Sequence, residues 1–141
     1  MESVDYFDTF IAVAPDSIAE ARVVPPEKGA GPTVAGLTYA MIATSPYGYT
    51  SGDVIFAIWA DRKGLPEAER EAAQRAFYSR GQACLRSSDL GKRYGWGIHS
   101  DANGRIALYA LGTAEYESFA SGVNPLDGSQ IRVVRAMRSA H

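Results

Sequence analysis

A tight turn in the second half of the chain constrains the fold most. Residues 101–104 read Asp-Ala-Asn-Gly between two largely apolar segments. Asn-Gly favours the positive backbone angles of a hairpin turn, so we expect residues 95–111 to form two antiparallel strands. An even number of loop residues would place His99 on the same face as Ile106 and Leu108. The opposite face would then hold Trp96, Ile98, Ala107 and Tyr109.

The remaining segments alternate between strand and helix patterns. Residues 7–13 are β-prone, residues 53–61 are almost wholly apolar, and residues 131–137 place Arg132 and Arg135 among apolar side chains. We expect each to be a strand, with 53–61 buried on both faces. Helices are predicted over 33–44, 66–80 and 113–121. This order predicts an α+β fold, as a single two-layer domain over 1–141 with a small, mainly antiparallel sheet and two or three flanking helices.

Composition limits the class of protein. The chain has 141 residues, of which 46% are hydrophobic and 21% charged, as expected of a globular domain and not of a disordered chain or a coiled coil. Cys84 is the only cysteine, so an internal disulfide is excluded and no metal site is expected. The N-terminus is acidic without an apolar run behind it, and no segment approaches the roughly 20 apolar residues of a membrane span. We therefore expect a cytoplasmic protein without a membrane partner.

Basic and hydroxyl side chains gather between the helix 66–80 and the hairpin. Arginine forks and hydroxyl groups bind carboxylates and phosphates, and Ser88 suits the cap of a short helix. We expect a small anionic or phosphate-bearing ligand here, with Arg135 and Arg138 of the last strand as contributors to a site of Arg86, Ser87, Ser88, Lys92, Arg93 and Trp96. In the alternative interpretation this segment is only a capped turn whose arginines pair with aspartates.

Two further functions compete with this one. Cys84 and His99 are the residue types of a cysteine-dependent enzyme, in which the histidine activates the thiol. Against that role, a lone cysteine is commonly a small buried side chain, and His99 beside apolar neighbours suits a packed, hydrogen-bonded core residue. The basic residues also suit a nucleic-acid-binding module, and exposed aromatic residues suit a homodimer. The sequence identifies no cofactor.

Four sequence blocks resemble the signature of a known family. They are Pro46-Tyr-Gly-Tyr-Thr-Ser-Gly-Asp-Val54, Cys84-Leu-Arg-Ser-Ser88, Lys92-Arg-Tyr-Gly-Trp-Gly-Ile-His-Ser-Asp101 and Ala136-Met-Arg-Ser139. The family consists of small, uncharacterised, mainly bacterial proteins and is a domain of unknown function. The resemblance covers nearly the whole chain and implies one complete domain, but it assigns no reaction and no functional residue.

A shorter pattern is similar to the YjbR-type proteins, which have a frataxin-like α+β fold. It consists of Ile55-Phe-Ala57 as a strand, then a helix, then Leu90-Gly-Lys-Arg-Tyr-Gly-Trp96 leading into a strand. This resemblance implies an antiparallel sheet with flanking helices, and nucleic-acid binding.

Overall fold

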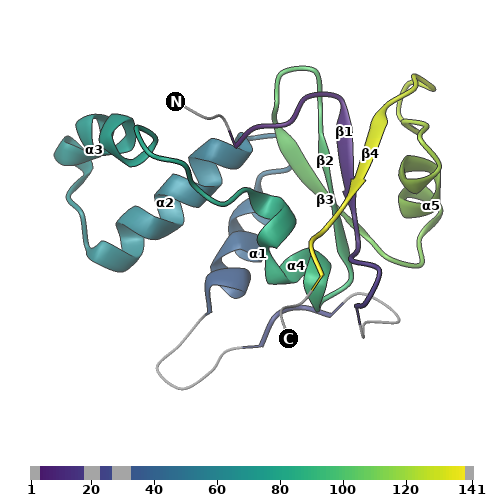
Figure 1. Cartoon of the computed structure of the whole chain (residues 1–141), viewed down its shortest axis with the longest axis horizontal. Coiled ribbons are helices and arrows are strands. Elements are labelled where there is room, and N and C mark those ends of the chain that lie inside the picture. Colours follow the sequence, from purple (N-terminus) through teal and green to yellow (C-terminus); the bar gives the residue numbers. More distant parts are fainter. Residues whose placement is uncertain (1–3, 18–22, 27–32, 139–141) are drawn as a thin grey trace.

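Four strands form one sheet in the computed structural model, which describes residues 4–17, 23–26 and 33–138 (Figure 1). The strands are β1 (Thr9–Ala12), β2 (Trp96–Ser100), β3 (Ile106–Ala110) and β4 (Arg132–Arg135). Their order in the sheet is β3-β2-β1-β4. β2 is antiparallel to both β1 and β3, whereas β4 is parallel to β1. The α+β class and the largely antiparallel sheet predicted from the sequence are confirmed.

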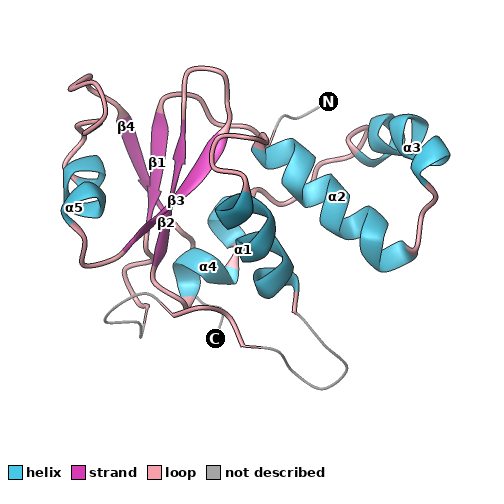
Figure 2. Ribbon diagram, turned by 180° about the vertical axis from the view of Figure 1, so that it is seen from behind, coloured by secondary structure: helices cyan, strands magenta, loops and turns pink. Residues whose placement is uncertain are grey.

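Helices cover both faces of this sheet (Figure 2). Within the described residues they are α1 (Val34–Thr44), α2 (Ser51–Lys63), α3 (Arg70–Phe77), α4 (Asp89–Lys92) and α5 (Ala114–Ala120). Short 3-10 turns occupy Glu67–Glu69 and Leu85–Ser87. The two layers expected from the sequence correspond to the sheet and the helices α1, α2 and α4, and α5 adds cover on the second face.

The segment predicted as a buried central strand is helical. Residues 53–61 lie within α2, which begins at a capping box: the Thr50 hydroxyl accepts the Asp53 N–H and the Asp53 carboxylate accepts the Thr50 N–H. Gly64 ends α2 in the left-handed conformation (φ 68°). Residues 54–60 read as continuously apolar because α2 packs into two clusters, with Val54 in one and Phe56 in the other. Ile55-Phe-Ala57, part of the YjbR-type pattern, is therefore helical.

The hairpin forms as predicted, but the residues of its second strand lie on the opposite faces from those expected. The loop between Ser100 and Ile106 has an odd number of residues, because Ile98 pairs with Leu108 and His99 with Ala107. Directly opposed residues share a face. His99 therefore lies with Ala107 and Tyr109, whereas Trp96, Ile98, Ile106 and Leu108 form the other face.

The side chains of β1 point alternately into two hydrophobic clusters, one on each face of the sheet. Ile11 packs with Ile42, Val54 and Ile98 under α1, α2 and α4. Phe10 points the other way and packs against Tyr116 and Phe119 of α5. β2 passes Phe10 at Gly97, where a Cβ would overlap the Phe10 and Tyr116 rings. The glycine thus allows the sheet and α5 to approach closely.

Candidate functional site

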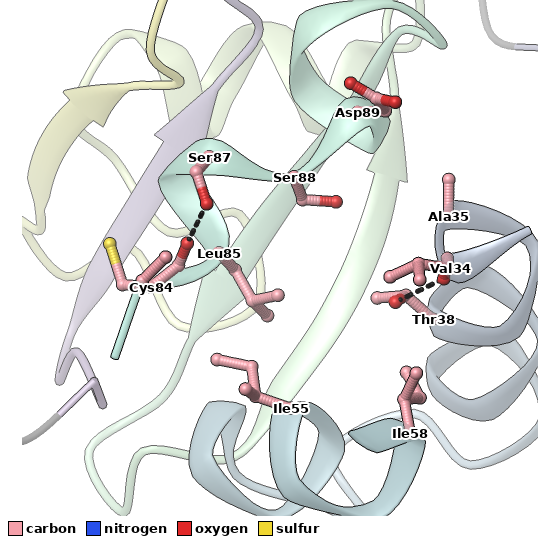
Figure 3. A pocket seen from close by; sticks show the side chains of 11 residues that line it. Val34, Ala35, Thr38, Ile55, Ile58, Cys84, Leu85, Ser87, Ser88 and Asp89 are labelled. Atoms are coloured by element: carbon pink, nitrogen blue, oxygen red, sulfur yellow. Dashed lines mark hydrogen bonds between the residues drawn. The ribbon is translucent and has the colours of Figure 1, made fainter. Parts of the chain in front are cut away.

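Two adjoining cavities lie between α1, α2, α3 and the segment 80–89, with volumes of about 270 and 690 Å³. They share four lining residues, Val34, Ile55, Ile58 and Ala83. We call the two cavities together the α2 groove. Figure 3 shows the smaller cavity, with Ile55 and Ile58 below and the turn Leu85–Ser87 opposite α1.

One face of α2 forms the floor of the α2 groove. Ile55, Ile58, Trp59 and Arg62 line it and follow the i, i+3, i+4, i+7 spacing of a helix face. Ile58 is buried and Ile55 and Trp59 are half-buried, so the floor is apolar over most of its length. The floor becomes positively charged only at its end, near the C-terminus of α2.

Three exposed cations surround that end of the groove: Arg62, Lys63 and Arg80. The Lys63 ammonium lies 5.4 Å from the centre of the Trp59 ring, and the Trp59 and Phe77 rings are 4.9 Å apart. Within the described part of the chain, no carboxylate oxygen lies within 4.0 Å of any of the three cations. Their charge is therefore available to an anion that enters the groove.

Hydroxyl groups line the opposite end. The Ser88 hydroxyl accepts the Leu90 N–H at 3.2 Å and caps α4, as the sequence predicted. Ser87 donates to the Cys84 carbonyl at 2.8 Å. In Figure 3 the Ser88 side chain points towards α1, whereas the sulfur of Cys84 points away from the cavity. Ser88 is thus the hydroxyl that can meet a ligand at this end.

The predicted anion-binding residues divide into separate locations. Ser87 and Ser88 line the groove, and Arg86 reaches the edge of the sheet, where its Nε donates to the Arg135 carbonyl at 2.8 Å. Arg138 is exposed just beyond β4. The structure therefore brings Arg86 together with Arg135 but keeps both outside the groove.

The other predicted residues lie near the end of α4. Lys92 is its last residue, and the Arg93 guanidinium lies 3.8 Å from the Asp89 carboxylate. Trp96 packs against Tyr39 at 5.1 Å and donates its indole N–H to the Val23 carbonyl at 3.0 Å. None of these three residues lines the α2 groove.

Cys84 and His99 lie on opposite faces of the sheet. The Cys84 sulfur lies 3.5 Å from the Tyr6 hydroxyl and packs against the cluster of Val4, Phe56, Ala60 and Tyr78. Burial and the thiol raise the pKa of Tyr6, and Arg86 opposes that shift. His99 instead packs against Phe119 under α5, with ring centres 4.4 Å apart. The structure does not bring the thiol and the imidazole together.

His99 is the buried end of a chain of hydrogen bonds that continues through two half-buried tyrosines. Its Nδ1 lies 2.8 Å from the Tyr47 hydroxyl, which lies 2.9 Å from the Tyr109 hydroxyl. Tyr47 adopts a left-handed backbone (φ 58°), which is unfavourable for a bulky residue. Burial lowers the pKa of His99 and raises that of Tyr47. This arrangement is that of a packed, hydrogen-bonded core histidine.

Among the described residues, no three His, Cys, Asp or Glu side chains are grouped so that they could hold a metal ion. No helix in the same part of the chain is both long and apolar enough to cross a bilayer.

Sequence reasoning missed the cations of the α2 groove because it placed 53–61 in a strand. A strand would place Ile55 on the opposite face from Ile58 and Arg62, whereas a helix places all three on one face. Two local signals favoured the helix. Thr50 and Asp53 have the spacing of a capping box, and Gly64 follows Arg62 and Lys63 as a C-terminal cap does.

Comparison with known proteins agrees with the resemblance seen in the sequence blocks. No curated protein and no solved structure matches the chain. The whole length, residues 1–141, matches a family described as a family of unknown function, DUF6157. The chain therefore belongs to this family.

Proposed function

We propose that this protein binds a small amphiphilic anion in the α2 groove, with an apolar body on the floor and a carboxylate or phosphate among the three cations. The observation that carries the proposal is an apolar helix face that ends at Arg62, Lys63 and Arg80, none of which has a carboxylate within 4.0 Å among the described residues.

The dimensions of the groove suit a small molecule. A cavity of about 690 Å³ lies within the roughly 300–1,000 Å³ range of ligand sites, and the adjoining cavity extends it towards Ser88. Ile55 and Ile58 provide apolar surface along the shared part. The two arginines can each donate paired hydrogen bonds to a planar or tetrahedral anion. A neutral apolar molecule would use only the floor.

The test compares octyl phosphate, octanoate and octanol by isothermal titration calorimetry. We expect the two anions to bind and octanol to bind at least about tenfold more weakly, because charge-assisted hydrogen bonds contribute about 1.5–3 kcal/mol. Arg62→Gln and Arg80→Gln should each weaken octyl phosphate by about tenfold. Arg75→Gln is the matched control, because Arg75 is exposed on α3 and pairs with Glu71 at 3.3 Å outside the groove.

A second variant tests occupation of the groove without removing charge. Ala83 is exposed and lines both cavities, so Ala83→Trp should obstruct the part that they share and abolish binding while leaving the core intact. Equal affinities for octanol and octyl phosphate, or equal losses in Arg75→Gln and Arg62→Gln, would contradict the proposal.

A further inference from the structure

β4 lies at one edge of the sheet and leaves part of its backbone open. The Arg132 N–H donates to the Asp8 carbonyl at 3.0 Å, and the Ala136 N–H donates to the Ala12 carbonyl at 2.8 Å. Backbone groups of successive residues in a strand point to alternate sides. The N–H and C=O groups of Val133 therefore point away from β1, as do those of Arg135.

Neighbouring segments cover the two ends of this edge. On one side the Ile131 N–H donates to a carbonyl in the loop after α5 at 2.9 Å. On the other, Arg86 donates from Nε to the Arg135 carbonyl, and its own carbonyl accepts the Met137 N–H at 2.7 Å. In the described part of the chain, the Val133 N–H, the Val133 carbonyl and the Arg135 N–H have no hydrogen-bond partner.

Positive charge surrounds these three groups. Arg132, Arg135 and Arg138 are exposed, and Arg86 is half-buried beside them. No carboxylate oxygen of a described residue lies within 4.0 Å of any of these arginines. The edge thus combines open backbone hydrogen-bonding groups with uncompensated positive charge.

A cavity opens beside the same edge on the α5 face. It has a volume of about 370 Å³ and is lined by Val133 and Arg135 of β4. Leu111, Tyr116 and Ala120 provide apolar surface on its other side, and Glu117 of α5, residues 12–15 and Ser17 also line it. A strand placed along β4 would direct alternate side chains to this face, where an apolar one can enter the cavity.

We propose that the β4 edge binds an extended acidic segment of another protein as a fifth strand. The segment's backbone pairs with Val133 and Arg135, its carboxylates face the arginines, and one apolar side chain occupies the cavity beside α5. Backbone pairing supplies affinity in this mode, and the side chains supply specificity. The charge complementarity identifies the partner as acidic.

A second copy of the chain is a poor occupant of the same edge. Pairing β4 with itself would gather the exposed Arg132 and Arg135 of both copies along one seam. Like charges on paired strands are destabilising. The arginines therefore select against self-association and in favour of a carboxylate-rich strand.

The test uses a fluorescein-labelled, end-blocked peptide in which Glu alternates with Val, titrated with the full-length protein and read by anisotropy. We expect binding that weakens as salt is added, and an affinity about tenfold lower for Arg135→Gln. Val133→Pro removes one open N–H without removing a bond to β1, so it should abolish binding. Val133→Thr, which keeps that N–H, should bind like the wild type.

Three results would overturn the proposal. The first concerns peptides N-methylated at every second residue, one peptide for each of the two possible patterns. If both bind as tightly as the unmodified peptide, charge alone explains the affinity. The second is tighter binding of a single-stranded oligonucleotide that displaces the peptide, which would assign the edge to nucleic acid. The third is absence of binding by the acidic peptide. Ala83→Trp, which blocks the α2 groove, should leave peptide binding unchanged, so failure of either proposal is distinguishable from failure of the other.

Discussion

Burial controls the ionisation of His99. The side chain is 1% exposed and packs against Phe119, and its Nε2 has no hydrogen-bond partner among the described residues. Desolvation disfavours the imidazolium and lowers the pKa of His99, although the carboxylates of Asp101, Asp8 and Asp127 act in the opposite direction. Protonation therefore places a charge in a core where no carboxylate of the described residues lies within 4.0 Å of the imidazole.

Stability should consequently fall when the pH is lowered through the range in which the unfolded chain protonates His99. An unfolded histidine has a pKa of about 6.5, so below that pH the unfolded state binds more protons than the folded state. The free energy of unfolding should decrease by up to about 1.4 kcal/mol per pH unit until the pH reaches the lower, folded-state pKa.

Urea unfolding at several pH values between about 7.5 and 5 measures this slope. His99→Gln, which does not titrate, should be less stable overall but should lose most of the pH dependence in this range. An unchanged slope in His99→Gln would assign the dependence to other groups.

At the scale of elements, local signals predicted most segments but misassigned α2. The hairpin and the helices at 33–44 and 113–121 are confirmed because Asn-Gly, Thr33 and Thr113 act through neighbouring backbone groups. A continuously apolar run has no periodic contrast, so periodicity could not distinguish a strand from a helix over 53–61. The flanking residues contain that information: Thr50 and Asp53 cap one end of α2, and Gly64 ends the other.

The capping box predicts a measurable contribution from Thr50. Thr50→Ala removes the hydroxyl that accepts the Asp53 N–H at 3.1 Å, and should lower the free energy of unfolding by about 1 kcal/mol. Thr50→Ser keeps an acceptor at the same place and should remain close to the wild type. Denaturant midpoints of the three proteins, compared at equal slope, test this expectation. Equal midpoints for Thr50→Ala and Thr50→Ser would show that the hydroxyl does not cap α2 in solution.

The arrangement of the whole molecule depends on contacts that local patterns do not encode. β1 and β4 pair although they lie at opposite ends of the chain, and no turn connects them directly. The sequence predicted Ser87 and Ser88 as site residues beside a capped turn; both line the groove, and their role in binding stays a prediction. The cations of that groove come from α2 and from the end of the segment after α3. Their convergence follows only from the packing of α2 beside α3.

Stability should also be distributed unevenly over the molecule. α3 has no fully buried residue and is held on one side by Ala73 and Phe77, whereas β1 is buried along its length. Segments with few buried contacts open at a lower free energy than core strands. We therefore expect backbone amides of α3 to exchange with deuterium much faster than those of β1 and β2.

Ligand binding should change this pattern selectively, because α3 forms a wall of the α2 groove through Ala73, Ala76 and Phe77. A ligand that binds the folded groove stabilises the segments that line it against local opening. Octyl phosphate should slow exchange in α3 and leave α5, on the far side of the sheet, unaffected. Deuterium exchange of the wild type and of Ala83→Trp, followed by mass spectrometry, tests this expectation. Octyl phosphate should not protect α3 in the variant, because the variant should not bind it. Equal protection of α5 and α3 would indicate a general effect on the fold and would place the ligand outside the groove.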